Sequence, residues 1–227
     1  MPKYINSNLI FENRTEAGKQ LAEKLISYRL QNPIVIALPR GGVPVAKPIS
    51  DLLHAKLDIM ISKKIGAPFN PELAIGAVTS GGDYVIAPYY LDIINEMPLE
   101  KKWDYIQNQI VYLIKDCQEK EKKYCGSRSG RFETCHYMGH DVIIVDDGIA
   151  TGMTAMAAIK SIKKQNPKNL IIAAPVISHE AFEDLKEQVN KIEFLKIPES
   201  FIAVGVHYLS FEQVGDEEIK NMLDQSL

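Results

Sequence analysis

Short, continuous apolar runs that end abruptly in polar, glycine-containing turns constrain the fold of this chain more than any other feature. The runs are Ile34–Leu38, Leu57–Ser62, Val142–Val145 and Leu170–Val176. Strands that are apolar along their whole length are typically buried on both faces, as in parallel sheets covered by crossover helices. Because helical patterns stand between the runs, the sequence predicts an α/β fold with a doubly wound, mostly parallel sheet and helices on both faces.

The helices are predicted by apolar residues at steps of three and four. One stripe begins at Leu21, and a second covers Val45–Leu53, after the first strand. A long helix is expected from Leu99 to about Lys123, and a crossover helix is expected over Met153–Lys164. The polar stretch that follows the long helix, Tyr124–Asp141, has no regular period and is predicted to be a long loop.

Composition and charge exclude several classes of protein. The 227 residues are 46% hydrophobic and 24% charged with a net charge of −3, so the chain is predicted to be globular and to bind no nucleic acid. No apolar run reaches the ~18 residues of a membrane helix, and the first residues lack a signal core, so we expect a cytoplasmic protein with no membrane contact. The three cysteines lack C-x-x-C spacing, which argues against a disulfide framework or zinc site.

The densest chemical signal is the segment Val145–Thr154, which lies between a predicted buried strand and a predicted helix. In a doubly wound sheet, such a junction faces the ligand crevice at the carboxyl ends of the strands. Backbone amides at a helix start, with the hydroxyls of Thr151 and Thr154, favour binding of a phosphate monoester.

The adjacent acids Asp146 and Asp147 need a different partner, because carboxylates repel phosphate. Vicinal sugar hydroxyls can donate to them, so a ribose 5-phosphate satisfies both halves of the segment. The alternative is that the acids only cap the helix. Neither a P-loop nor a G-x-G-x-x-G dinucleotide motif occurs in the chain.

Val145–Thr154 resembles the phosphoribosyl pyrophosphate signature of type I phosphoribosyltransferases: an apolar strand, two acids and T-G-x-T. The resemblance implies that Asp146 and Asp147 hold the ribose hydroxyls. It also implies a loop that binds the 5-phosphate, formed by Ala150, Thr151, Gly152, Met153 and Thr154.

Further segments match this family in the expected order. Leu38–Gly42 resembles its pyrophosphate loop, in which a non-proline peptide is often cis, and this implies diphosphate contacts from Arg40, Gly41 and Gly42. Lys63 and Lys64, predicted to close the second strand, stand where related enzymes carry Arg-Lys against the diphosphate.

The similarity extends over roughly residues 8–222 and is strongest to a subgroup of predicted phosphoribosyltransferases, through Ile65–Val78, the long helix and Phe201–Gly205. It implies one phosphoribosyltransferase-like domain over residues 1–227. A long helix and basic loop are inserted at about 98–140, and a small hood follows at about 197–227. Cys125 replaces an arginine of the subgroup, and Arg128 or Arg131 could supply that diphosphate or phosphate contact instead.

The implied activity transfers ribose 5-phosphate from phosphoribosyl pyrophosphate to a nitrogenous base and releases diphosphate, as in nucleotide salvage. Lys64 and Arg40 would be catalytic, because they neutralise the departing diphosphate. Mg²⁺ would be held by the diphosphate and water near Asp146 and Asp147, without direct protein ligands. The alternative is a non-catalytic regulatory protein that binds phosphoribosyl pyrophosphate or a nucleotide. A homodimer is one option for assembly.

Two features bear on the base and on the mobile segment. Ala150 replaces an aspartate of the 6-oxopurine enzymes, and no lysine follows Leu170–Val176, so hypoxanthine, guanine and xanthine are disfavoured. The residues do not choose among other bases. A segment that excludes water is expected at Gly66–Glu72 or at Tyr124–Arg131.

Overall fold

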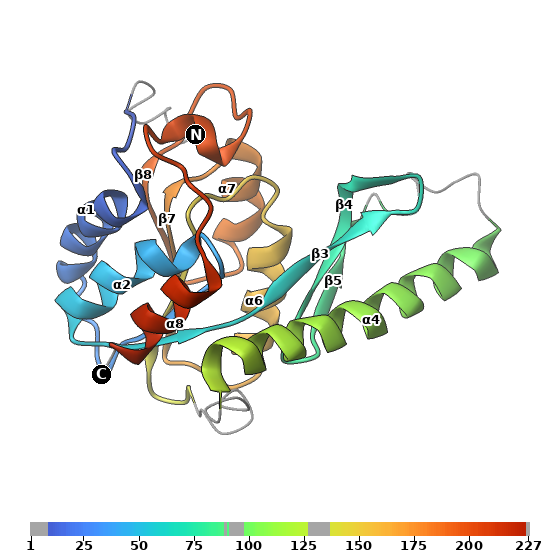
Figure 1. The fold of residues 1–227 in the computed structure, drawn as a ribbon, viewed down its shortest axis with the longest axis horizontal. Helices are drawn as coiled ribbons and strands as arrows, with labels where there is room; N and C mark the ends of the chain where they lie inside the picture. The colour runs from blue at the N-terminus through green and yellow to red at the C-terminus, as the bar shows by residue number, and fades with distance from the viewer. Residues whose placement is uncertain (1–8, 89, 91–97, 127–136, 226–227) are drawn as a thin grey trace. The chain divides into compact units, whose positions relative to one another are not determined.

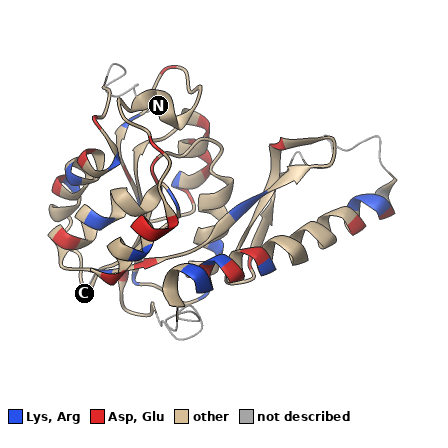
Figure 2. Cartoon of the chain, in the orientation of Figure 1, with Lys and Arg blue, Asp and Glu red and all other residues tan. Residues whose placement is uncertain are grey.

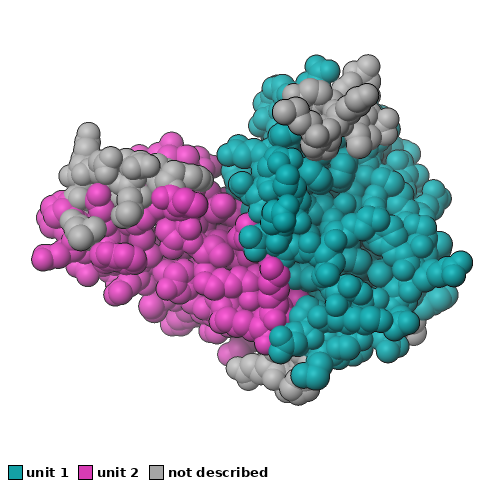
Figure 3. Space-filling view, turned by 180° about the vertical axis from the view of Figure 1, so that it is seen from behind, with its two compact units in different colours: residues 1–59, 136–152, 165–227 teal, residues 60–135, 153–164 magenta. Residues whose placement is uncertain are grey.

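The computed structural model describes residues 9–88, 90, 98–126 and 137–225 (Figure 1). The chain divides into two compact units, which Figure 3 colours separately. Unit 1 comprises residues 1–59, 136–152 and 165–227, and unit 2 comprises residues 60–135 and 153–164. Each unit has its own sheet.

The sheet of unit 1 has five strands in the order β2-β1-β6-β7-β8, and every neighbouring pair is parallel. The predicted α/β fold with a mostly parallel sheet is confirmed. The three central strands are almost wholly buried, as their apolar sequences require. The strands are β1 (Ile34–Ala37), β2 (Lys56–Ile59), β6 (Asp141–Val145), β7 (Asn169–Val176) and β8 (Lys191–Lys196).

Helices flank this sheet (Figure 1). Helix α1 (Arg14–Ile26) packs against α2 (Gly42–Leu53), and α7 (His179–Lys186) packs against β8. Asn13 begins α1 by accepting a hydrogen bond from the amide of Glu16 at 2.9 Å. The C-terminal part of the unit holds a 3₁₀ turn, η2 (Val204–His207), and α8 (Asp216–Asp224), which contacts α2.

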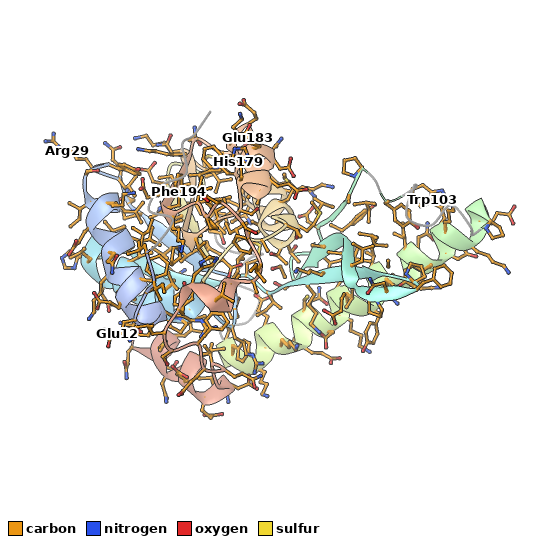
Figure 4. The ribbon with its side chains drawn as sticks, turned by 90° about the horizontal axis from the view of Figure 1, so that it is seen from above. Glu12, Arg29, Trp103, His179, Glu183 and Phe194 are labelled. Carbon is orange, nitrogen blue, oxygen red and sulfur yellow. The ribbon has the colours of Figure 1, made fainter. Side chains whose placement is uncertain are left out.

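Among its described residues, unit 2 contains a second, antiparallel sheet and two helices. Its strands are β3 (Ser62–Ala67), β4 (Asn70–Thr79) and β5 (Tyr84–Ile86), and its helices are α4 (Leu99–Cys125) and α6 (Met153–Lys163). The long helix and the crossover helix are therefore close to their predicted bounds. Figure 2 shows the acidic and basic residues of α4 gathered towards its two ends, with an uncharged stretch between them. Ile106 on this helix is buried, whereas Trp103, labelled in Figure 4, is 53% exposed.

One predicted strand was wrong in its extent. The prediction placed a single strand over Leu57–Ser62, but β2 ends at Ile59, and Ser62 begins β3 in the other sheet. Lys63 and Lys64 therefore lie in an antiparallel strand and do not close a strand of the parallel sheet. The hydrophobic pattern does not show where β2 ends and β3 begins, because Met60 and Ile61 between the two strands are also buried.

No helix within the described ranges is long and apolar enough to cross a membrane.

Candidate functional site

Two loops meet at the carboxyl ends of neighbouring strands β1 and β6. The amide of Leu38 donates to the carbonyl of Val145 at 2.8 Å, which continues the strand pairing into the turn. The loop after β1 forms a tight turn, closed by a hydrogen bond from the amide of Gly42 to the carbonyl of Leu38 at 3.1 Å. The Pro39–Arg40 peptide is cis, as the resemblance implies.

Gly41 allows these loops to touch. A β-carbon at this position would lie 1.9 Å from Oδ2 of Asp147, far closer than atoms can approach. A β-carbon at Gly42 would lie 2.7 Å from the carbonyl oxygen of Val145. Because φ of Gly41 is −63°, it is the lack of space, and not the backbone conformation, that requires glycine there.

The two acids of the predicted ribose site have different surroundings. Oδ1 of Asp146 accepts a hydrogen bond from the amide of Asp147 at 2.8 Å. Oδ2 of Asp147 accepts one from Nε of Arg14 at 2.8 Å, and the backbone oxygen of Asp147 accepts one from the hydroxyl of Tyr208 at 2.5 Å. Burial, followed by the charge of Asp147, raises the pKa of Tyr208, so this hydroxyl remains a donor.

The predicted 5-phosphate loop is anchored to the end of β7. The amide of Ile149 donates to the carbonyl of Val176 at 2.9 Å, and the hydroxyl of Ser178 donates to the carbonyl of Ala150 at 2.6 Å. The same hydroxyl accepts from the amide of Ala181 and so caps α7.

The end of this loop leads directly into a helix. Gly152 has φ +70°, a backbone conformation that residues other than glycine rarely adopt, and α6 begins at the next residue, Met153. Thr151 is exposed, and Thr154 is half-buried in the first turn. A backbone that enters a helix in this way presents amide groups to an anion.

Arg40 lies on the surface of unit 1. Its side chain is 42% exposed, and Nη1 is 3.9 Å from Oδ1 of Asp216 in α8. An exposed pair at this distance stabilises the fold by at most ~1 kcal/mol, so ligand binding could displace it at little cost.

The lysine pair of unit 2 is split by the alternation of the strand. Lys63 makes an ion pair with Asp116 of α4, whereas the neighbouring Lys64 is exposed. Burial works against the charge of Lys63, but the hydrogen bond and charge of Asp116 raise its pKa above the ordinary value. Lys63 is therefore held by α4, and Lys64 is the lysine that can meet a ligand.

Several sequence predictions fall elsewhere. Arg128 lies outside the described residues, as does most of Tyr124–Arg131. The other candidate mobile segment, Gly66–Glu72, comprises the end of β3, the turn at residues 68–69 and the start of β4. Cys125 is the last residue of α4.

Sequence reasoning missed two residues that hold the site together. Arg14 was missed because its partner Asp147 is 133 residues away along the chain. Ser178 had a usable signal, since a serine between an apolar strand and a helix is a typical N-cap.

A family model described as "Phosphoribosyl transferase domain" matches residues 10–209. The chain belongs to this family. The match covers Leu38–Gly42 and Val145–Thr154, and it confirms the family that Val145–Thr154 indicates.

Two relatives support the assignment to the phosphoribosyl transferase family. A protein named "Putative phosphoribosyl transferase Rv0571c" from Mycobacterium tuberculosis is 33% identical over 222 residues, which are 96% of this chain and 47% of that protein. The crystal structure of TT1426 from Thermus thermophilus is similar with a TM-score of 0.78 and 35% identity, and the match covers 96% of this chain and 99% of TT1426. The chain thus spans about half the length of its Mycobacterium relative.

Proposed function

We propose that this phosphoribosyl transferase domain moves the ribose 5-phosphate of phosphoribosyl pyrophosphate to a nitrogenous base and releases diphosphate, as in nucleotide salvage. The contact of Gly41 with Asp147 carries the proposal, because it joins the diphosphate loop to the ribose acids. A substrate that carries a diphosphate on one side of a ribose and a 5-phosphate on the other needs both loops at once.

The described residues then have distinct tasks. Asp146 and Asp147 accept hydrogen bonds from the ribose hydroxyls, and the loop 150–154 binds the 5-phosphate with backbone amides. The amide of Gly41 faces the diphosphate, whereas the amide of Gly42 already donates to the carbonyl of Leu38, so Gly42 contributes through its lack of a side chain. Holding the activated sugar and the base in one geometry supplies much of the rate enhancement.

In the reaction, a ring nitrogen of the base forms a bond to ribose C1 while the bond from C1 to the diphosphate oxygen breaks. The electron pair of the broken bond leaves with the diphosphate, whose negative charge grows towards the transition state. Lys64 and Arg40 stabilise that growing charge. Both side chains are accessible enough for this role.

Magnesium fits this site as a companion of the substrate. No group of three metal-ligating side chains occurs among the residues that the structure describes. Diphosphate oxygens and waters would supply the octahedral shell that Mg²⁺ prefers, and Asp146 and Asp147 would meet the ion through water or the ribose hydroxyls. When bound, the ion neutralises part of the diphosphate charge.

Replacement of Asp146 tests the proposal. Asp146→Asn should raise the Kd for phosphoribosyl pyrophosphate with Mg²⁺ by ~10-fold or more, because it removes a charge-assisted acceptor of a ribose hydroxyl. The control is Asp51→Asn on the exposed face of α2, which removes the same charge away from both loops. Calorimetry that shows equal affinity for Asp146→Asn and wild type would reject the ribose assignment.

Diphosphate release across a panel of nucleobases separates the enzyme from a regulator. Release with one base and not with the others identifies the acceptor. Tight binding without release from any base would show a sensor of the activated sugar and overturn the catalytic part of the proposal.

A further inference from the structure

Arg14, at the first position of α1, makes three different contacts inside unit 1. Nε donates to Oδ2 of Asp147 at 2.8 Å, and Nη1 donates to the carbonyl oxygen of Glu212 at 2.8 Å. The guanidinium carbon lies 3.7 Å from the ring centroid of Phe211. The side chains of Arg14 and Asp147 are only 12% and 14% exposed, so this ion pair is shielded from water.

The position of Arg14 is fixed by pairing between residues 11–12 and residues 209–210. The amide of Leu209 donates to the carbonyl of Phe11 at 2.8 Å, and the amide of Ser210 donates to the carbonyl of Glu12 at 2.9 Å. The ring of Tyr208 packs between Phe11 and Phe211, with centroids 5.3 and 5.2 Å away. The backbone pairing and the packed rings thus hold the Arg14 guanidinium over the ring of Phe211.

The charge of Arg14 matters because of where Asp147 lies. Oδ2 of Asp147 sits against Gly41, in the loop proposed to bind diphosphate. An unpaired carboxylate there would repel both phosphate groups of the substrate, and repulsion between shielded charges is strong. The guanidinium cancels this charge and also holds the carboxylate in place against the loop.

We propose that Arg14 is a positioning residue for phosphoribosyl pyrophosphate: it acts through Asp147, which it neutralises and presses against Gly41. The inference rests on the proposed function for its substrate. It assigns a task to a residue outside the signature segment and outside both loops.

A double-mutant cycle tests whether Arg14 acts through Asp147. The variants are Arg14→Gln, Asp147→Asn and the two combined, and the readout is the Kd for phosphoribosyl pyrophosphate with Mg²⁺. Arg14→Gln alone should raise Kd on the order of 10-fold, because it leaves a shielded carboxylate beside the diphosphate. In the Asp147→Asn background, the same change should alter Kd by less than about 2-fold.

Lys24 provides a matched control on the same helix. It makes an ion pair with Glu193 at 2.5 Å, donates to the carbonyl oxygen of Phe194 at 2.7 Å and lies 5.9 Å from the Phe194 ring centroid. These contacts repeat the three kinds made by Arg14, but they lie at β8, where Figure 4 labels Phe194. Lys24→Gln should leave Kd unchanged.

A second measurement needs no substrate. Amide hydrogen exchange of residues 38–43 should be faster in Arg14→Gln than in wild type, and unchanged in Lys24→Gln. Arg14→Lys should bind the substrate more tightly than Arg14→Gln but less tightly than wild type. Lysine supplies the positive charge but cannot donate to Asp147 and Glu212 with the planar geometry of a guanidinium. This variant also serves if Arg14→Gln does not fold.

The outcomes separate this inference from the proposed function. Equal losses from Arg14→Gln in both backgrounds would mean that Arg14 contacts substrate directly or acts only on the fold, and would overturn the inference. An unchanged Kd in Arg14→Gln would do the same. If wild type binds no phosphoribosyl pyrophosphate, the proposed function fails, and unchanged exchange at residues 38–43 would then refute the positioning of the loop as well.

Discussion

Substitution of Gly41 by alanine tests the contact on which the site depends. The backbone of Gly41 is helical, with φ −63° and ψ −29°, so alanine fits the conformation and lowers the entropy of the unfolded chain, a gain of about 0.4–1 kcal/mol. The new β-carbon, however, would lie 1.9 Å from Oδ2 and 2.4 Å from Cγ of Asp147. Overpacking of this kind costs about 1–3 kcal/mol.

The net destabilisation expected for Gly41→Ala is about 1–2 kcal/mol. In a chain of this size that corresponds to a fall in Tm of ~2–8 °C. Differential scanning calorimetry measures the shift, and Gly215→Ala is the control, because φ there is −80° and no atom lies within 4 Å of the added carbon. Combining Gly41→Ala with Asp147→Ala should recover part of the loss, since alanine lacks both colliding atoms.

The reasoning is refuted if Gly41→Ala is as stable as Gly215→Ala. In that case the two loops do not touch, and a shared diphosphate and ribose site loses its main structural support.

Two further predictions concern charge. Lys64→Ala should reduce turnover ~100-fold or more while the Kd for phosphoribosyl pyrophosphate changes much less, because the charge on diphosphate grows only towards the transition state. Lys120→Ala, on α4, is the control. An equal effect of Lys64→Ala on binding and turnover would contradict the role assigned to Lys64. Burial, followed by the charge of Lys196, lowers the pKa of His207, so below about pH 6.5 the unfolded chain binds a proton that the folded chain resists, and stability falls as pH falls. His207→Gln should flatten the dependence of Tm on pH between about 7.5 and 5.5, and a slope equal to that of wild type would show that His207 does not contribute to it.

The parallel sheet could be predicted from sequence because its strands are buried on both faces. Ile34–Ala37 and Val142–Val145 pair directly with one another, and both are continuous apolar runs. The sequence of the second sheet, in contrast, contains residues that argue against strands. Gly66, Pro68 and Pro71 interrupt its first hairpin, and residues of this kind normally break strands. The pairing shifts register on both sides of Gly66, which is how the sheet accommodates them.

The site could be predicted only where its residues stand close together in the sequence. Asp146 and the loop that ends at Gly152 stand in one short segment, so their spacing was visible. The difference between Lys63 and Lys64 depends on which face of a strand each one occupies, and two adjacent lysines look alike in a sequence. The Arg14–Asp147 pair joins distant positions and has no local signal.

The pairing of residues 11–12 with residues 209–210 affects the order in which this fold can form during synthesis. Arg14 leaves the ribosome well before its partner carbonyl at Glu212, which comes 198 positions later. The contact with Glu212 has to wait until β8 and the residues after it have been made, and closing so long a loop is entropically costly. A nascent chain that stops before Phe211 can form the parallel sheet but lacks the ring that supports Arg14. Incomplete copies are therefore left with the two acids but without the full support of the cation that neutralises Asp147.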